Sequence, residues 1–350
     1  MTPISVWLTL LLAGPATAVA VPGPCPAGSW EQFSREGGGP DNNFVNAVVF
    51  DDAGRGYFGT GDLHPPETHG GGLSIRQPDG AWLRIRMEEG GLASNSVYSL
   101  AVSEEGLLVG SLAGVDRLEL AADPRDPDPR WTALPRKPVG AFALADVVDI
   151  AVEPDGRAWF ATTYGLFVAE DGGWRRFGTS AADDGLESRF ITALALAPGG
   201  ELWVGTQGKG VAVRGTDGRW TQHRSADGGL GNDYVHDIAF DQRGRAWVGT
   251  GIGVSVFDGD GWAVRTPADS GLPDADVRAV AVDGRGWIWL GTHQGIAVVD
   301  GERWSVCSPE GAPGAGPGHP LIVAAAPAPD GSMWFGSYGG GAFVWRPEEP

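Results

Sequence analysis

The sequence predicts an all-β protein, a seven-bladed β-propeller with four antiparallel strands in each blade. Three observations predict it: 57 glycines in 350 residues, 15 tryptophans spread from end to end, and one phrase that recurs seven times. So much glycine disfavours a helical protein. A hydrophobic content of 42% excludes a disordered chain. Many short strands joined by tight turns therefore remain as the fold class.

The recurring phrase consists of a β run, a D-x-x-G turn, W-x-G-T, a short glycine loop, a second β run, D-G and then Trp. Its clearest copies are VHDIAFDQRGRAWVGTGIGVSVFDGDGW from Val235 and VRAVAVDGRGWIWLGTHQGIAVVDGERW from Val277. Aligned on the G-[TS] step, the seven copies have this step at Gly59, Gly110, Ala161, Gly205, Gly249, Gly291 and Gly336. Their spacing of 42 to 51 residues is typical of propeller blades, which repeat about every 40 to 50 residues.

Each unit divides into four strands, a to d, at its turns. Strand a is the V-x-x-[IVL]-A run, strand b ends at W-x-G-T, strand c is G-[VIL]-x-V, and a D-G hairpin leads to the tryptophan of strand d. The strand-d tryptophans are Trp82, Trp131, Trp174, Trp220, Trp262 and Trp304. The seventh unit ends near Trp345 without a strand d, whereas residues 28–33 have the form of one. We expect this N-terminal strand to complete the last blade, because closing the ring removes its free sheet edges.

The N-terminus has the form of an export signal. Residues 4–21 are largely apolar, and Ala18-Val19-Ala20 gives the small-x-small pattern that precedes a cleavage site. No Lys or Arg precedes the apolar stretch, which leaves an uncleaved anchor as the alternative. We expect a signal peptide at residues 1–20, a short lead at 21–27 and one propeller at 28–350. The mature protein would then be a periplasmic or extracellular monomer without a membrane span.

Charge and cysteine content limit the possible partners. The net charge is −19 and the longest basic cluster is Arg175-Arg176, which excludes a nucleic-acid binder. The two cysteines are too few for a disulfide framework and match no zinc motif. Cys25 and Cys307 flank strands that should be neighbours in the ring, so a disulfide is one prediction. Positions at opposite ends of those strands would instead be too far apart to be bridged.

The phrase GLGNDYVHDIAFDQRGRAWVGTGIGVSVFDG, with its sister GLPDADVRAVAVDGRGWIWLGTHQGIAVVDG, resembles the two-component regulator propeller repeat. In that family such propellers commonly form the extracytoplasmic sensing part of hybrid sensor kinases, often ones that respond to oligosaccharides. The resemblance implies a sensor-type binding propeller. This chain shows no Y-Y-Y domain and no kinase after the propeller, so the resemblance implies recognition and not signalling by this chain alone.

The expected binding face carries the d-to-a and b-to-c loops around the central mouth of the ring. Positions that are the same in every unit support the blade, whereas positions that differ are free to recognise a ligand. The differing residues are Asn43, Asn95, Arg189 and Asp233 before strand a, Tyr98, His236 and Arg278 within it, and Tyr164, Gln207, Lys209, His293, Gln294 and Tyr338 in the b-to-c loops. Polar and aromatic groups at one mouth suit a polar ligand such as a glycan. The alternative for each is an ordinary exposed loop side chain.

Two groups of side chains are candidate metal ligands. The first b-to-c loop is enlarged and contains Asp62, His64, Glu67 and His69, which are ligand types of zinc, although a solvated loop would explain them equally. On strand a, two units have a carboxylate where the others have Ala or Ser. Asp149 and Asp237 would either bind a cation in the channel or accept hydrogen bonds from a neighbouring strand.

Enzymatic signatures are absent from the sequence: there is no G-x-S-x-G nucleophile elbow and no phosphate-binding loop. We therefore predict a non-catalytic, secreted or periplasmic propeller that binds a polar ligand without a cofactor. One alternative is a protein-interaction scaffold with a partner in the cell envelope. Another is a metal-dependent hydrolase or lyase that uses the histidines and the glutamate of the enlarged loop.

Overall fold

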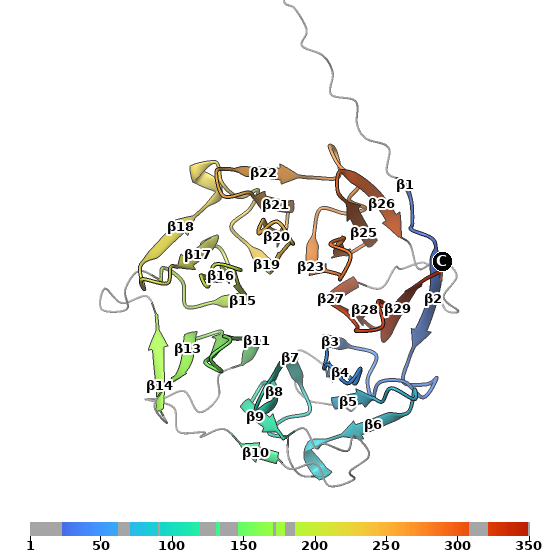
Figure 1. The fold of residues 1–350 in the computed structure, drawn as a ribbon. Helices are drawn as coiled ribbons and strands as arrows, with labels where there is room; N and C mark the ends of the chain where they lie inside the picture. Colours follow the sequence, from blue (N-terminus) through green and yellow to red (C-terminus); the bar gives the residue numbers. More distant parts are fainter. Residues whose placement is uncertain are drawn as a thin grey trace, which may run out of the picture.

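The computed structural model shows seven antiparallel sheets arranged as a ring around a common centre (Figure 1). The structure describes residues 23–61, 71–89, 92–119, 131–133, 146–170, 173–178, 186–307 and 321–348. The prediction of an all-β, seven-bladed propeller with four strands in each blade is therefore confirmed. The predicted signal peptide lies outside the described residues.

The first four blades follow the chain, with strand a innermost. Blade 1 is β3 (Val45–Phe50), β4 (Gly56–Thr60), β5 (Gly72–Arg76) and β6 (Trp82–Ile85). Blade 2 is β7 (Val97–Ser103), β8 (Gly106–Ser111), β9 (Gly114–Leu118) and β10 (Trp131–Ala133). Blade 3 is β11 (Val147–Val152), β12 (Ala158–Thr162), β13 (Gly165–Glu170) and β14 (Gly173–Phe177). Blade 4 is β15 (Ile191–Leu196), β16 (Leu202–Thr206), β17 (Val211–Arg214) and β18 (Trp220–His223).

The remaining blades lead back to the N-terminus. Blade 5 is β19 (Val235–Phe240), β20 (Ala246–Thr250), β21 (Gly253–Phe257) and β22 (Trp262–Arg265). Blade 6 is β23 (Val277–Val282), β24 (Ile288–Thr292), β25 (Gly295–Asp300) and β26 (Arg303–Cys307). Blade 7 is β27 (Leu321–Pro327), β28 (Met333–Tyr338), β29 (Ala342–Pro347) and β2 (Gly28–Phe33). Two short 3-10 helices, η1 (Met87–Glu89) and η2 (Ser225–Asp227), follow strand d of blades 1 and 4.

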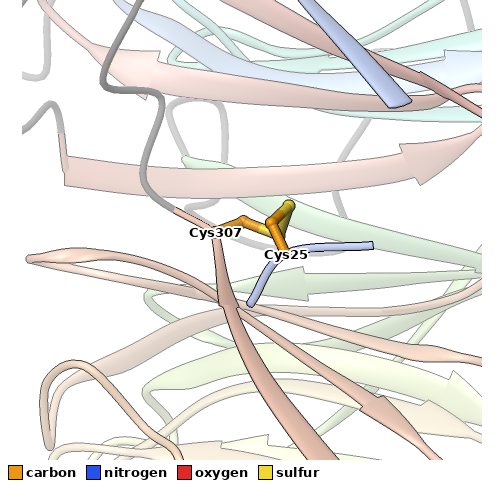
Figure 2. The surroundings of a disulfide bond; sticks show 2 residues. All are labelled: Cys25 and Cys307. Carbon is orange, nitrogen blue, oxygen red and sulfur yellow. A yellow bond between two sulfur atoms is a disulfide. The ribbon is translucent and has the colours of Figure 1, made fainter. Parts of the chain in front are cut away.

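The ring is closed by the N-terminal segment, as the sequence predicts. Strand β2 pairs antiparallel with β29 over six residues, from Gly28 opposite Pro347 to Phe33 opposite Ala342. Just before it, β1 (Gly23–Pro24) pairs in parallel with β26 of blade 6. The structure also joins Cys25 to Cys307 by a disulfide, with Cα atoms 4.7 Å apart (Figure 2). The segment is thus attached to blade 6 covalently and to blade 7 by a full strand.

Neighbouring blades meet through a glycine and a tryptophan that recur on strand b. The tryptophans of the W-x-G-T phrase are almost fully buried, and each packs against the next blade; Trp289, for example, lies in a cluster with Met333 and Phe335 of blade 7. Two residues later, a Cβ added at Gly249 would lie 2.8 Å from the carbonyl oxygen of Val277. The absence of a side chain allows strand b of blade 5 to approach blade 6 this closely at Gly249. The repeated residues therefore form the seams of the ring.

Candidate functional site

The mouth of the ring is formed where the seven innermost strands begin. In every blade the pairing of strand a with strand b shifts register around the second residue of strand a, or the third in β27, so that this residue has no partner across the ladder. A bulge of this kind redirects the side chain of the unpaired residue. The seven bulge residues are Asn46, Tyr98, Val148, Thr192, His236, Arg278 and Val323. They differ from blade to blade, although the backbone that presents them is the same.

A cavity of about 370 Å³ lies at this mouth. Its lining residues are Asn46, Tyr98, Asp146, Val148, Thr163, His236, Arg278, Val323 and Tyr338. Six of the seven bulge residues therefore line it, together with Thr163 of a b-to-c loop, Tyr338 at the end of β28 and Asp146 directly before β11. Four of the residues that the sequence singled out are brought together here: Tyr98, His236, Arg278 and Tyr338.

One wall of the cavity carries a charged group of three side chains from blades 5 and 6. Arg278 Nε donates to Asp276 Oδ2 at 2.9 Å, and its Nη2 lies 2.9 Å from the same oxygen. On the other side of the carboxylate, His236 Nε2 lies 3.0 Å from Asp276 Oδ1. Burial lowers the pKa of His236 most, nearby Arg278 acts in the same direction, and Asp276 opposes both. The imidazole is therefore held mainly in its neutral form, next to a guanidinium that is fixed by a carboxylate.

The opposite wall contains a carboxyl group in a different setting. Asp146 precedes β11 in blade 3, and burial raises the pKa of its carboxyl. Among the described residues it has no ion-pair or hydrogen-bond partner. A further acceptor lies between these two walls: Asn46 donates through Nδ2 to the carbonyl oxygens of Gly61 and Val97, whereas its buried Oδ1 has no partner among the described residues. The cavity therefore offers one carboxyl without a described partner and one fixed guanidinium.

Three of the predicted residues serve the loops that frame the mouth. Asn43, Asn95 and Asp233 occupy the same place before strand a, and each accepts a hydrogen bond through Oδ1 from the backbone N–H eight residues earlier, at 2.7 to 2.8 Å. The amide groups of Asn43 and Asn95 also donate to Glu36 and Glu88. None of the three lines the cavity. A position that differs between units can thus still be structural, because Asn and Asp satisfy the same backbone donor.

The other six predicted residues lie on the rim outside the cavity. Arg189 lies over the ring of Phe190 at 4.8 Å, and Gln294 donates to Asp274. Gln207, Lys209, His293 and Tyr164 are exposed, with Tyr164 at 48%. The structure adds exposed Phe190, Tyr234 and Ile252 in the neighbouring loops. Phe190 and Tyr234 directly precede strand a, and Ile252 lies in the b-to-c loop of blade 5. Sequence reasoning missed them because it gave no weight to the residue directly before strand a or to an aliphatic residue in a b-to-c loop.

The two carboxylates of strand a join neighbouring blades. Asp149 accepts from the N–H of Ile150 and, across the seam, from the N–H of Leu194 in blade 4 at 2.7 Å. Asp237 does the same with Ile238 and with Val280 of blade 6. Burial is the largest effect on both and raises the pKa of each to about 7, although the N–H donors lower it. The second of the two predicted roles, accepting hydrogen bonds from a neighbouring strand, is confirmed.

The predicted metal ligands Asp62, His64, Glu67 and His69 lie outside the described residues. Within the part of the chain that the structure describes, no group of three or more His, Cys, Asp or Glu side chains is arranged to hold a metal ion. No helix of the described residues is long and apolar enough to cross a membrane.

The two-component regulator propeller model matches residues 229–251 and 271–294, which belong to the fifth and sixth units. The resemblance inferred from the repeats is therefore confirmed. No curated protein matches the chain.

Solved structures share the fold. The extracellular domain of a hybrid two-component system from B. thetaiotaomicron is 21% identical, with a TM-score of 0.73 over 92% of this chain and 41% of its own. A second such domain from that organism is 18% identical, with a TM-score of 0.67 over 88% of this chain and 39% of its own. Virginiamycin B lyase from Staphylococcus aureus is 12% identical, with a TM-score of 0.66 over 91% of this chain and 98% of its own. The chain thus spans about two fifths of the length of the two-component relatives.

Proposed function

We propose that this propeller, which carries two-component regulator propeller repeats, is a periplasmic or extracellular binding protein of the sensor type that recognises a polar ligand at its mouth without catalysis. The observation that carries the proposal is the cavity of about 370 Å³, lined by six bulge residues that differ while their backbone is the same. Concave sites with a few converging polar groups are where small ligands usually bind.

The lining chemistry supports a ligand with hydrogen-bonding groups. Tyr98 and Tyr338 each supply an aromatic face and a hydroxyl, and Arg278 supplies fixed donors. A glycan is one ligand of this kind, since sugars combine many hydroxyls with apolar ring faces that stack on aromatic rings. Extracellular domains of hybrid two-component systems have the same fold, which supports a sensor role outside the cytoplasm.

The proposal is tested by calorimetric titration of the mature protein with a panel of oligosaccharides and other small polar compounds. We expect at least one compound to bind, and Tyr98→Ala and Tyr338→Ala to weaken its binding about fivefold or more, because stacking on an aromatic ring contributes roughly 1 kcal/mol or more. Tyr164→Ala, on the rim outside the cavity, is the matched control and should leave the affinity unchanged. Affinity that survives both mouth substitutions would contradict the proposal.

A second candidate function is an interaction scaffold in the cell envelope, and the exposed side chains of the rim favour it. Tyr164, Phe190, Tyr234 and Ile252 are 40 to 52% exposed in the loops of blades 3 to 5. Aromatic residues in such positions are enriched in protein interfaces. A pull-down from an envelope fraction with the wild type and with Phe190→Ser/Tyr234→Ser separates the two functions. Only a scaffold should lose a retained partner through this change.

A further inference from the structure

The charges at the mouth lie on opposite walls, and this arrangement restricts the ligand. Arg278 belongs to blade 6 and Asp146 precedes the first strand of blade 3. In a ring of seven these blades are separated by two blades on one side and by three on the other. The guanidinium and the carboxyl therefore face one cavity from nearly opposite directions, with Tyr98, Asn46 and Tyr338 along the wall between them.

The two groups differ in how far the protein already neutralises them. Asp276 binds Arg278 through Nε and Nη2, which fixes the plane of the guanidinium and leaves Nη1 without a described partner; the side chain is 40% exposed. An Arg held in this way is preorganised to donate to a carboxylate. Asp146 has no described cationic partner, and its carboxyl is partly buried. A cationic group of the ligand would supply the missing partner.

Singly charged ligands fit this arrangement less well. A simple anion would meet Arg278 but would be repelled by Asp146 and by a protein of net charge −19. A simple cation would meet Asp146 but leave Arg278 facing a like charge. A neutral sugar would desolvate both charges without pairing either one. A ligand with both charges separated along its length avoids all three costs.

We propose that the mouth binds a small zwitterion, with its carboxylate on Arg278 and its ammonium group on Asp146, and that a short peptide with free termini is the class that fits. This inference rests on the proposed function and narrows the ligand of the same site. The volume of about 370 Å³ accommodates a chain of two or three small residues. Tyr98 and Tyr338 pack along its backbone.

The test uses trialanine, N-acetyl-trialanine, trialanine amide and the neutral sugar maltotriose as probes, each titrated calorimetrically into the folded protein. Trialanine should bind, and each blocked peptide should bind about tenfold more weakly or worse, because a hydrogen bond to a charged group contributes roughly 1.5 kcal/mol or more. Asp146→Asn should weaken the binding of trialanine to the same extent. Trialanine and the acetylated peptide should then bind this variant with equal affinity. Arg278→Gln should abolish the difference in affinity between trialanine and trialanine amide, whereas Arg278→Lys should retain part of this difference.

The matched control is Asp155→Asn, which makes the same charge change in blade 3 on the opposite face, where Asp155 lies in an exposed turn. It should leave every affinity unchanged. Equal binding of trialanine and its blocked forms, or no binding of trialanine, overturns the inference. Binding of maltotriose alone, weakened by Tyr98→Ala, overturns the inference while the proposed function stands. Trialanine binding that is unaffected by every mouth substitution overturns both.

Discussion

Two aspartates three residues apart on blade 3 show how the mouth differs from the channel wall beneath it. Asp149 is engaged by two backbone N–H groups, one of them from blade 4, and so joins two blades. Asp146 faces the mouth cavity and has no described partner. An aspartate side chain therefore stabilises the fold at position 149 and is available to bind a ligand at position 146. The difference lies in whether the backbone of the next blade comes within hydrogen-bond distance.

The seams and the closing segment should therefore control stability, and the mouth should control binding. The largest effect is expected at the closure. Cys25→Ser/Cys307→Ser removes a crosslink between residues 282 positions apart. The unfolding free energy should fall by about 2–4 kcal/mol, because the crosslink restricts the unfolded chain. Denaturant titration of the two proteins under oxidising conditions measures it, and coincident midpoints would contradict the account of ring closure.

A seam substitution should have the next largest effect. Gly249→Ala places a Cβ against the carbonyl oxygen of Val277, and the backbone must shift to admit it. We expect a loss of about 1–3 kcal/mol in unfolding free energy, typical of overpacking. Gly261→Ala in the same blade is the control, because no atom lies within 4 Å of the added Cβ. Similar thermal midpoints for the two variants would show that the seam is not closely packed.

The two aspartates give a direct test of the comparison. Asp149→Ala leaves the N–H groups of Ile150 and Leu194 without an acceptor. The substitution also removes the cost of burying a carboxyl, which offsets part of this loss, so we expect the unfolding free energy to fall by about 1–2 kcal/mol. Asp146→Ala should change stability by less than about 0.5 kcal/mol. Chemical denaturation measures both. The comparison fails if Asp146→Ala is the more destabilising change.

The pH dependence of stability should follow the channel carboxyls. In the folded protein burial raises the pKa of Asp149 and Asp237 to about 7, whereas a free aspartate has a pKa of about 4. Between about pH 4 and pH 7 the folded state therefore binds more protons than the unfolded state, so these groups lower stability as pH rises through that window.

Asp149→Asn/Asp237→Asn removes this titration. The stability of the double variant relative to wild type should increase from pH 4 to pH 7 and level off above it. Urea titrations at several pH values measure this difference. A difference that is flat across the window would mean that both carboxyls are ionised throughout.

The sequence predicted the ring because its glycines and tryptophans recur at blade spacing and perform the same packing in every copy. The closing strand followed from a missing strand d at one end and an extra one at the other. The site was only partly predictable. His236 and Arg278 were found because they differ between units, but Asn95 and Asp233 differ too and serve the loop.

Asp276 was missed because its contact with His236 joins two neighbouring blades, and Asp146 was missed because its importance depends on the residues that face it across the cavity. Such contacts are set by the register of strand a and by blade-to-blade geometry. Neither appears in the pattern of a single unit.

The most direct test of the central claim, that ligand recognition lies in the mouth, is a crystal structure of the protein with the tightest-binding compound of the panel. We expect ligand density in the cavity, within hydrogen-bond distance of Arg278 and in contact with Tyr98 or Tyr338. Density on the rim or on the opposite face, with the mouth occupied by solvent alone, would contradict it.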